Sequence, residues 1–231
     1  MAYPDPPFNA MGADRGGLDI DLINAIGTAL GSSVTLLAYQ GADFNGILDE
    51  LGAGAYDCVI AGTTVTPERA RKAAFAPPYL VSGQALAVDT ARLPGVKSVA
   101  DLAGLTIGVQ RGNTSQPIAE ALVAEGKAHS VRVYAYGAIE QALTDLTTGG
   151  CDAFMKLAPV LTELVRPIAD VEVVQRGLSR EELAIAVRLG DDTTLQRIAQ
   201  AQAALEADGT LQTIRRRWLG NPYRDQGLTM H

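Results

Sequence analysis

The sequence predicts an α/β fold made of two lobes with one plan. Short apolar segments of strand length alternate with amphipathic segments of helix length along most of the chain. A helix–glycine–aspartate–strand pattern occurs twice, at Leu51-x-x-Gly54-x-x-Asp57 and at Leu146-x-x-Gly149-x-x-Asp152. Two similar lobes are the simplest explanation of this repeat, although a pattern so short also recurs by chance. The 231 residues, 47% hydrophobic and 19% charged, suffice for one large domain or two small ones.

The first series of elements begins with a helix over Leu18–Leu30. Its apolar residues recur at helical spacing, and Gly31 ends it. We then expect a strand over Val34–Ala38, a helix over Phe44–Leu51 and a buried strand over Cys58–Ala61.

The second series repeats this alternation, and a helical tail follows it. The expected elements are a strand over Thr106–Gln110, a helix over Gln116–Glu125 stopped by Gly126, a strand over Val131–Tyr136, a helix over Ala138–Thr147, a strand over Ala153–Met155, and helix over Thr193–Leu219 broken at Asp208-Gly209. Ligands of open α/β sheets lie beyond the carboxyl ends of the strands. We therefore expect Gly62 and Leu157, each five residues past the aspartate of its repeat, to face a shared cleft.

Composition and charge argue against several classes of protein. The net charge of −7 and the pI near 4.8 argue against nucleic acid as a partner, and we interpret Arg215-Arg216-Arg217 as a solvated helix face. No apolar run approaches the roughly 20 residues that span a bilayer. No signal-peptide pattern follows Met1, so in an exported protein the signal has been removed.

The cysteines and histidines do not suggest metal or nucleophile chemistry. Cys58 and Cys151 lack metal-ligand spacing, and each lies in an apolar segment, which favours two buried free thiols over a disulfide. His129 and His231 make no metal site by themselves. We expect neither a metal nor a cofactor.

The segment from Gly62 to Arg69 predicts an anion site in the first lobe. Thr66 followed by Pro67 is typical of a helix start, and Arg69 then falls in the first turn, where a cation opposes the helix dipole. A bound carboxylate would explain that placement, because a guanidinium grips a carboxylate with two parallel hydrogen bonds. The alternative, a surface arginine paired with Glu68 or another neighbour, is equally open.

A second group of donors follows the predicted strand Thr106–Gln110. The segment Arg111–Pro117 is a glycine-containing turn that enters a helix, with Thr114 or Ser115 as its cap. Free backbone N–H groups at such a start favour an anion, although most turns of this kind are only caps. Two anion-competent helix starts, one in each lobe, indicate a binding site more strongly than either alone.

A series of motifs extends along nearly the whole chain. They are Pro6-Pro7-Phe8-Asn9, Gly17-Leu18-Asp19-Ile20-Asp21-Leu22, Phe44-Asn45-Gly46-Ile47, Thr64-Val65-Thr66-Pro67-Glu68-Arg69, Phe75-Ala76-Pro77-Pro78-Tyr79, Gly108-Val109-Gln110-Arg111-Gly112, Ala207-Asp208-Gly209-Thr210-Leu211 and Trp218-Leu219-Gly220. With these motifs the chain resembles the amino-acid-type periplasmic solute-binding proteins of ABC transporters. Their number and order make the resemblance specific.

The resemblance implies the type 2 periplasmic-binding fold, two Rossmann-like lobes joined by two hinge strands. Lobe 1 would comprise residues 1–86 and 187–231, lobe 2 residues 87–186, and the hinge strands would lie near Gln84–Val88 and Leu183–Val187. The implied activity is capture of a small carboxylate ligand, without chemistry, for the membrane permease of an ABC transporter. We expect a monomer that is located outside the cytoplasm, in the periplasm or on the cell surface, and whose lobes close on the ligand.

The resemblance also implies roles for single residues. Arg69, Thr64 and the Thr114 region with Asn113 would hold the ligand carboxylate, and Gly62 would offer its carbonyl. Phe44 would stack on the ligand, and Gln110 would line the second lobe.

The chain departs from the family pattern where an aspartate pairs with the ligand ammonium. Leu157 occupies that position, with Lys156 before it. An ammonium buried against either side chain would lose several kcal/mol of compensation. We therefore hypothesise a ligand without an α-ammonium, such as a keto acid, a hydroxy acid or a dicarboxylate.

Two further departures lie near the start of the chain. Asp5 stands where the family has an aromatic residue, and it either supplies a negative charge to the site or shapes the Pro4–Pro7 turn, which we favour. The family's first strand should precede Tyr3, and the sequence largely lacks it.

Two other functions compete with transport binding. Some relatives on this fold are dehydratases of cyclic carboxylates, and loss of the ammonium partner suits them too. Such chemistry needs a buried acid with a raised pKa, and neither Glu163 nor Asp5 makes a strong candidate. The other competitor is the ligand-sensing domain of a larger receptor or kinase.

Overall fold

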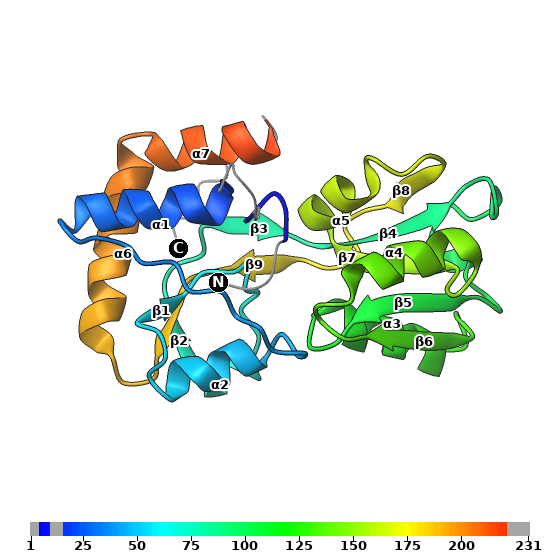
Figure 1. Ribbon diagram of the computed structural model, residues 1–231, viewed down its shortest axis with the longest axis horizontal. Helices are drawn as coiled ribbons and strands as arrows, with labels where there is room; N and C mark the ends of the chain where they lie inside the picture. Colours follow the sequence, from blue (N-terminus) through cyan, green and yellow to red (C-terminus); the bar gives the residue numbers. More distant parts are fainter. Residues whose placement is uncertain (1–4, 10–15, 221–231) are drawn as a thin grey trace. The chain divides into compact units, whose positions relative to one another are not determined.

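The computed structural model describes residues 5–9 and 16–220, which form two units. Unit 1 takes its described residues from the ranges 1–40, 45–81 and 181–231, and unit 2 comprises residues 41–44 and 82–180. Each unit has its own sheet and helices (Figure 1). Tyr3 and His231, named above, lie outside the described residues. The domain limits implied by the resemblance stay a prediction.

Unit 2 is built on a five-stranded sheet with the order β6-β5-β7-β4-β8. Strand β5 is parallel to both of its neighbours, whereas β4 runs antiparallel to β7 and β8. The elements are β4 (Gln84–Asp89), the 3-10 turn η2 (Val99–Asp101), β5 (Thr106–Gln110), α3 (Ser115–Ala124), β6 (Ser130–Tyr134), α4 (Ile139–Thr148), β7 (Ala153–Leu157), α5 (Ala158–Val165) and β8 (Val171–Gln175).

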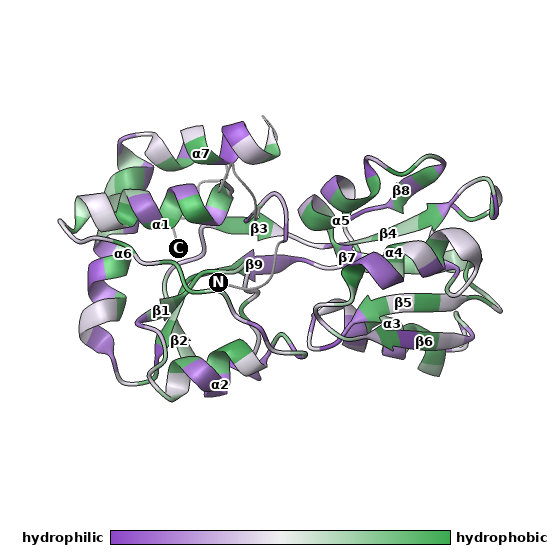
Figure 2. Ribbon diagram, in the orientation of Figure 1, coloured by the Kyte–Doolittle hydropathy of each residue, from purple (hydrophilic) through white to green (hydrophobic). Residues whose placement is uncertain are grey.

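Both faces of this sheet are covered, and the alternation of side chains along β4 shows how. Ala85 and Ala87 belong to the core beneath α4 and α5, whereas Leu86 and Val88 belong to the core beneath α3. All four side chains are fully buried. A strand covered on both faces has apolar residues at successive positions, and β4 and β5 are accordingly largely hydrophobic in Figure 2.

Unit 1 has a smaller sheet with the order β1-β10-β2, in which both pairings are antiparallel, and a separate pair β3-β9. The elements are α1 (Leu18–Ala29), α2 (Gly46–Gly52), β1 (Cys58–Val59), the 3-10 turn η1 (Arg69–Arg71), β2 (Ala73–Phe75), β3 (Leu80–Ser82), β9 (Glu181–Leu183), β10 (Ala186–Arg188), α6 (Asp192–Ala207) and α7 (Thr210–Leu219). Among the described residues, no helix has the length and apolar character needed to cross a bilayer.

Most of the elements expected from the sequence are confirmed, with shifts of one or two residues at their ends. The break in the C-terminal helix is confirmed as well. Helix α6 ends at Ala207, and Gly209 adopts a left-handed φ of 86° before α7 begins. Glycine takes this conformation without the steric penalty of a Cβ atom.

The strand predicted over Val34–Ala38 is wrong. These residues form no strand, and Leu36 and Leu37 are 39% and 50% exposed.

Cys58 is half-buried, so only Cys151 fulfils the prediction of two buried free thiols. An apolar segment needs a neighbouring strand to become part of a sheet. Strand β1, which begins at Cys58, has such a neighbour, β10, on one side only among the described strands.

The interpretation of Arg215-Arg216-Arg217 as a solvated face is wrong for its first member. Arg215 is 1% exposed, forms an ion pair with Glu206 at 2.6 Å, and donates to the Tyr79 carbonyl at 3.1 Å. Arg216 and Arg217 are exposed. The side chain of Arg215 therefore fixes α7 against α6 instead of facing water.

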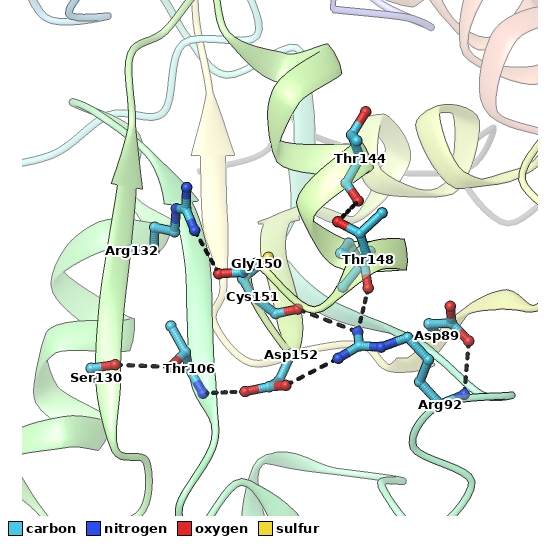
Figure 3. A network of polar contacts seen from close by, with 11 residues as sticks. Asp89, Arg92, Thr106, Ser130, Arg132, Thr144, Thr148, Gly150, Cys151 and Asp152 are labelled. Carbon is cyan, nitrogen blue, oxygen red and sulfur yellow. Dashed lines mark hydrogen bonds and ion pairs between the residues drawn. The ribbon is translucent and has the colours of Figure 1, made fainter.

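The repeated glycine has the same backbone conformation in both copies. Gly54 and Gly149 adopt left-handed φ values of 84° and 91° after helices α2 and α4. In unit 2, Arg92 donates to the Leu146 carbonyl at 2.6 Å and lies 3.5 Å from Asp152, which accepts from the Thr106 amide at 2.9 Å (Figure 3). This network joins the end of α4 to the starts of β5 and β7.

We expect Gly149→Ala to destabilise the protein more than Gly31→Ala. Both glycines have left-handed φ values, so each alanine costs about 1 kcal/mol in backbone strain. A Cβ atom at Gly149 would also lie 2.9 Å from Arg92 Nη2, whereas at Gly31 it meets nothing within 4 Å. Displacing Arg92 from the helix end should add roughly 1–2 kcal/mol, which urea unfolding measures. Equal losses in the two variants would contradict this account.

Candidate binding site

In unit 1 the guanidinium of Arg69, a predicted site residue, is buried and held by hydrogen bonds. This side chain is 5% exposed. Its Nε donates to Asn45 Oδ1 at 3.0 Å, and its Nη1 donates to the Thr64 carbonyl at 2.9 Å. The structure thus contradicts the alternative of a surface arginine, because a charge this deeply buried is held by fixed acceptors.

The local structure around Arg69 differs from the expected α-helix start. Arg69–Arg71 is a three-residue 3-10 turn, although Thr66 Oγ1 does accept from the Arg69 amide at 3.1 Å as a cap would. A single turn has few aligned peptide dipoles. The dipole argument for an anion at Arg69 is therefore wrong, and burial of the guanidinium replaces it.

Thr64 lies next to a carboxylate that the sequence analysis missed. Its hydroxyl donates to Glu181 Oε2 at 2.6 Å, and the two residues are 6% and 5% exposed. In this arrangement the hydroxyl proton points to Glu181. A ligand carboxylate would have to take over that hydrogen bond to be held by Thr64.

Gly62 is fixed by a buried acid. Its amide donates to Asp19 Oδ2 at 2.7 Å, and Tyr79 Oη donates to Asp19 Oδ1 at 2.8 Å. Burial raises the pKa of Asp19 to about 7, against the lowering effect of these two hydrogen bonds. Gly62 has a left-handed φ of 55°, and the Phe8 ring lies 3.2 Å from where a Cβ would be, so any other residue would be strained and would press on this ring.

Asp5 has the geometry of a turn residue. Its carbonyl accepts from the Phe8 amide at 2.9 Å and from the Asn9 amide at 3.2 Å, and its own amide donates to Asn9 Oδ1 at 3.1 Å. These bonds support the interpretation that Asp5 shapes the turn, which the sequence analysis favoured over a charge for the ligand.

In unit 2 the site residues gather at the carboxyl ends of β5 and β7. Lys156, 3% exposed, donates to Gln110 Oε1 at 2.5 Å. The same oxygen accepts from Asn113 Nδ2 at 3.3 Å, and Gln110 Nε2 donates to the Tyr136 carbonyl at 2.5 Å. Gln110 therefore orients the ammonium of Lys156 through a hydrogen-bonded group within one unit.

Two aromatic rings border this group. Phe44 is 4% exposed and packs on Tyr136 with 5.4 Å between ring centroids. The Lys156 ammonium lies 5.9 Å from the centroid of the same tyrosine, within range of a cation–π interaction. The stacking of Phe44 on a ligand stays a prediction, and Tyr136 is a member of the group that the sequence analysis missed.

The start of α3 has the features expected of an anion site. Thr114 is its N-cap, and Thr114 Oγ1 accepts from Gln84 Nε2 at 3.0 Å. Ser115 is fully buried, and its hydroxyl has no hydrogen-bond partner among the described residues. A buried hydroxyl of this kind at a helix N-terminus can donate to a ligand oxygen.

Leu157 ends β7, aligned with Gln84 of β4, and leads directly into α5. Gly62 likewise follows β1, so both residues lie at strand ends as expected. At the position where the resemblance implies an aspartate, unit 2 thus has an apolar side chain that is 8% exposed, next to the ammonium of Lys156.

Residues 1–221 match the family model described as "Bacterial extracellular solute-binding proteins, family 3". The chain belongs to this family. It is 30% identical over 220 residues to ABC transporter arginine-binding protein 1 of Escherichia coli (strain K12), covering 92% of this chain and 86% of that protein. It is 28% identical over 218 residues to the L-cystine-binding protein TcyJ of the same strain, covering 93% and 79%.

Solved structures with the same fold resemble this solute-binding protein over most of its length. An ancestral arginine-binding protein bound to arginine has a TM-score of 0.85 at 33% identity, covering 95% of this chain and 96% of that one. The ancestral amino acid-binding protein AncCDT-1, a precursor of cyclohexadienyl dehydratase, has a TM-score of 0.81 at 30% identity, covering 93% and 91%. The expected type 2 periplasmic-binding fold is confirmed.

One of the site residues that were missed had a signal in the sequence. Asp19 is an acid on the apolar side of a predicted helix, where a charge indicates a specific buried role. Glu181 lies far from Thr64 in sequence, and only the fold brings the two together. Within the described part of the chain, no cluster of three or more metal-ligating side chains occurs.

We expect the stability of this solute-binding protein to fall as the pH rises from about 4 to 7. The folded-state pKa of Asp19, about 7, lies above its ordinary value of 3.8. Folding therefore favours the neutral acid, and ionisation removes stability across this window, by up to roughly 4 kcal/mol. Urea unfolding of Asp19→Asn across this range should lack this slope, while the exposed Asp57→Asn controls for the loss of one charge. The same slope in all three proteins would contradict the assignment.

Proposed function

We propose that this protein captures a small carboxylate-bearing, amino-acid-like solute outside the cytoplasm and delivers it to the permease of an ABC transporter. The family supports solute binding, and its relatives are named for arginine and cystine. The protein would act as a monomer and leave its ligand chemically unchanged. Its acidic charge does not suit a nucleic acid.

The observation that carries the proposal is the burial of the Arg69 guanidinium. Asn45 and the Thr64 carbonyl fix its plane, so its orientation is set before a ligand arrives. Preorganisation of this kind favours a planar, bidentate partner such as a carboxylate. The N-terminus of α3 in unit 2, with the buried hydroxyl of Ser115, supports a second set of donors suited to an anion.

We expect Arg69→Ala to weaken ligand binding strongly and Arg71→Ala to preserve it. Both arginines lie in the same 3-10 turn, but Arg69 is buried and Arg71 is exposed. A thermal-shift screen of small acids and amino acids would first identify a ligand, since a ligand at 100 times its Kd stabilises by about 2.7 kcal/mol. Loss of the buried charge should then weaken binding about 100-fold or more in calorimetry. Unchanged affinity in Arg69→Ala would refute the site.

The pair Lys156 and Leu157 supports a ligand that lacks an α-ammonium. An ammonium next to the side chain of Leu157 would lose its hydration without gaining an acceptor. The cation of Lys156, held by Gln110, would add repulsion. A keto acid, a hydroxy acid or a dicarboxylate avoids both penalties, and a second carboxylate would be attracted to Lys156.

We expect the wild-type protein to bind a keto or hydroxy acid about tenfold or more tightly than the amino acid with the same side chain. Leu157→Asp should shift this preference towards the amino acid, because it introduces an acceptor for the ammonium. Leu157→Asn introduces a side chain of the same shape as aspartate but without its charge, and this variant serves as the control. Calorimetry on matched pairs of ligands measures the preference. Submicromolar binding of a standard L-amino acid by the wild-type protein would contradict the proposal.

A dehydratase on the same fold is the second candidate. The similarity to AncCDT-1, named as a precursor of cyclohexadienyl dehydratase, favours it, as does the buried carboxyl group of Glu181 beside Thr64. Incubation with prephenate and arogenate separates the two functions. Product formation that Glu181→Gln removes would establish the enzyme, whereas binding without turnover supports a transport protein.

A further inference from the structure

The backbone of unit 1 places Glu181 beside Thr64. Thr64 forms an antiparallel bridge with Leu183 of β9. Next to this bridge, the Val65 amide donates to the Glu182 carbonyl at 2.8 Å. Glu181 lies two residues before Leu183, so its side chain is on the same face as that of Thr64 and within reach of it. The register of this short pairing therefore brings a carboxylate to the hydroxyl of Thr64.

The hydroxyl of Thr64 has a single proton, and Glu181 takes it. Thr64 Oγ1 donates to Glu181 Oε2 at 2.6 Å, and both residues are buried. An ionised carboxylate accepts hydrogen bonds and donates none, which fixes the direction of this bond. Thr64 Oγ1 can therefore accept a hydrogen bond from a ligand, but it cannot donate one while Glu181 holds its proton.

Arg69 relates this acceptor to the ligand carboxylate. In the proposed function the carboxylate binds the guanidinium of Arg69, and Nη1 of the same guanidinium donates to the Thr64 carbonyl at 2.9 Å. The group on the α-carbon of an acid is the part of the molecule nearest to its carboxylate. Thr64, as a direct neighbour of the guanidinium, is therefore the residue of unit 1 that we expect to meet this group.

A hydrogen-bond donor on the α-carbon suits Thr64, whereas an acceptor does not. A keto oxygen would face the lone pairs of Thr64 Oγ1 and the charge of Glu181, and both sides would stay unpaired. An ammonium is a donor, but the proposed function excludes it because Leu157 offers its charge no acceptor. A hydroxyl donates one hydrogen bond and carries no charge, so it meets both conditions.

We propose that Glu181, by holding the proton of Thr64, makes the site selective for 2-hydroxy acids over the 2-keto acids of the same carbon skeleton. This inference rests on the proposed function and narrows its class of ligand. Glu181 determines specificity through Thr64 and does not itself have to contact the ligand.

Calorimetry with matched pairs of 2-hydroxy and 2-keto acids tests this selectivity. We expect the wild-type protein to bind the hydroxy acid about tenfold or more tightly than the keto acid, which leaves acceptors unpaired. Glu181→Gln should bring the ratio of the two affinities to about one or reverse it, because an amide can donate to Thr64 Oγ1 and release the threonine proton to the ligand. Thr64→Val removes the hydroxyl and should also bring the ratio to about one. Glu68→Gln, at an exposed position, removes the same charge and should leave the ratio unchanged.

The ratio separates specificity from stability, because partial unfolding lowers both affinities alike. Thr64→Val decides the question if Glu181→Gln does not fold. A ratio of about one in the wild-type protein, or a ratio that survives both substitutions, would overturn the role of Glu181 and leave capture of a carboxylate solute intact. Binding of neither acid would refute the proposed function together with this inference. Tighter binding of the matched amino acid would contradict the proposed class of ligand alone, since the hydroxy-to-keto ratio would still decide the role of Glu181.

Discussion

A guanidinium keeps its charge when it is removed from water, so its N–H groups must meet acceptors that the fold holds in place. Arg69 meets this requirement through Asn45 at the start of α2 and the carbonyl of Thr64. The segment from Thr64 to Arg69 is consequently fixed at both ends by one side chain. Gly62, just before it, is fixed by Asp19 and Tyr79. The geometry of the candidate site residues in unit 1 follows from these buried polar contacts, because each would leave an unsatisfied group if it were broken.

The candidate site residues of unit 2 follow the same rule with a different cation. Lys156 is buried in a strand, and Gln110 and Tyr136 surround its ammonium. An ammonium is a compact charge that accepts no hydrogen bond, whereas a carboxylate at the adjacent position would accept several. In the proposed function, Leu157 in place of an acceptor beside this cation changes the kind of ligand that unit 2 tolerates. Family membership therefore predicts capture of a solute, whereas the side chains of Lys156 and Leu157 bear on the identity of that solute.

Much of the fold could be predicted from the sequence because local signals agree with the tertiary structure. Gly31, Gly126 and Gly149 all have left-handed φ values just beyond a helix, as their positions predict. Contacts distant in sequence could not be predicted in this way. The pairs Thr64–Glu181 and Arg215–Glu206 depend on how helices and strands pack, and neither spacing nor periodicity encodes them. At Thr66-Pro67 a local signal was misleading instead. The strong signal for the start of a helix is followed by only one 3-10 turn.

The wrong prediction at Val34–Ala38 has a physical cause that concerns the whole of unit 1. The segment has the apolar character of a strand and follows a helix at the right distance, and its equivalent in unit 2, β6, is a strand. β6 is an edge strand, and its one partner is β5. Without an equivalent neighbour, the apolar residues of Val34–Ala38 remain exposed over a groove lined by α1 and β1. Strand propensity is expressed only where a partner exists. The local pattern at Val34–Ala38 was therefore that of a strand, and what it lacked was a neighbour in the described part of unit 1.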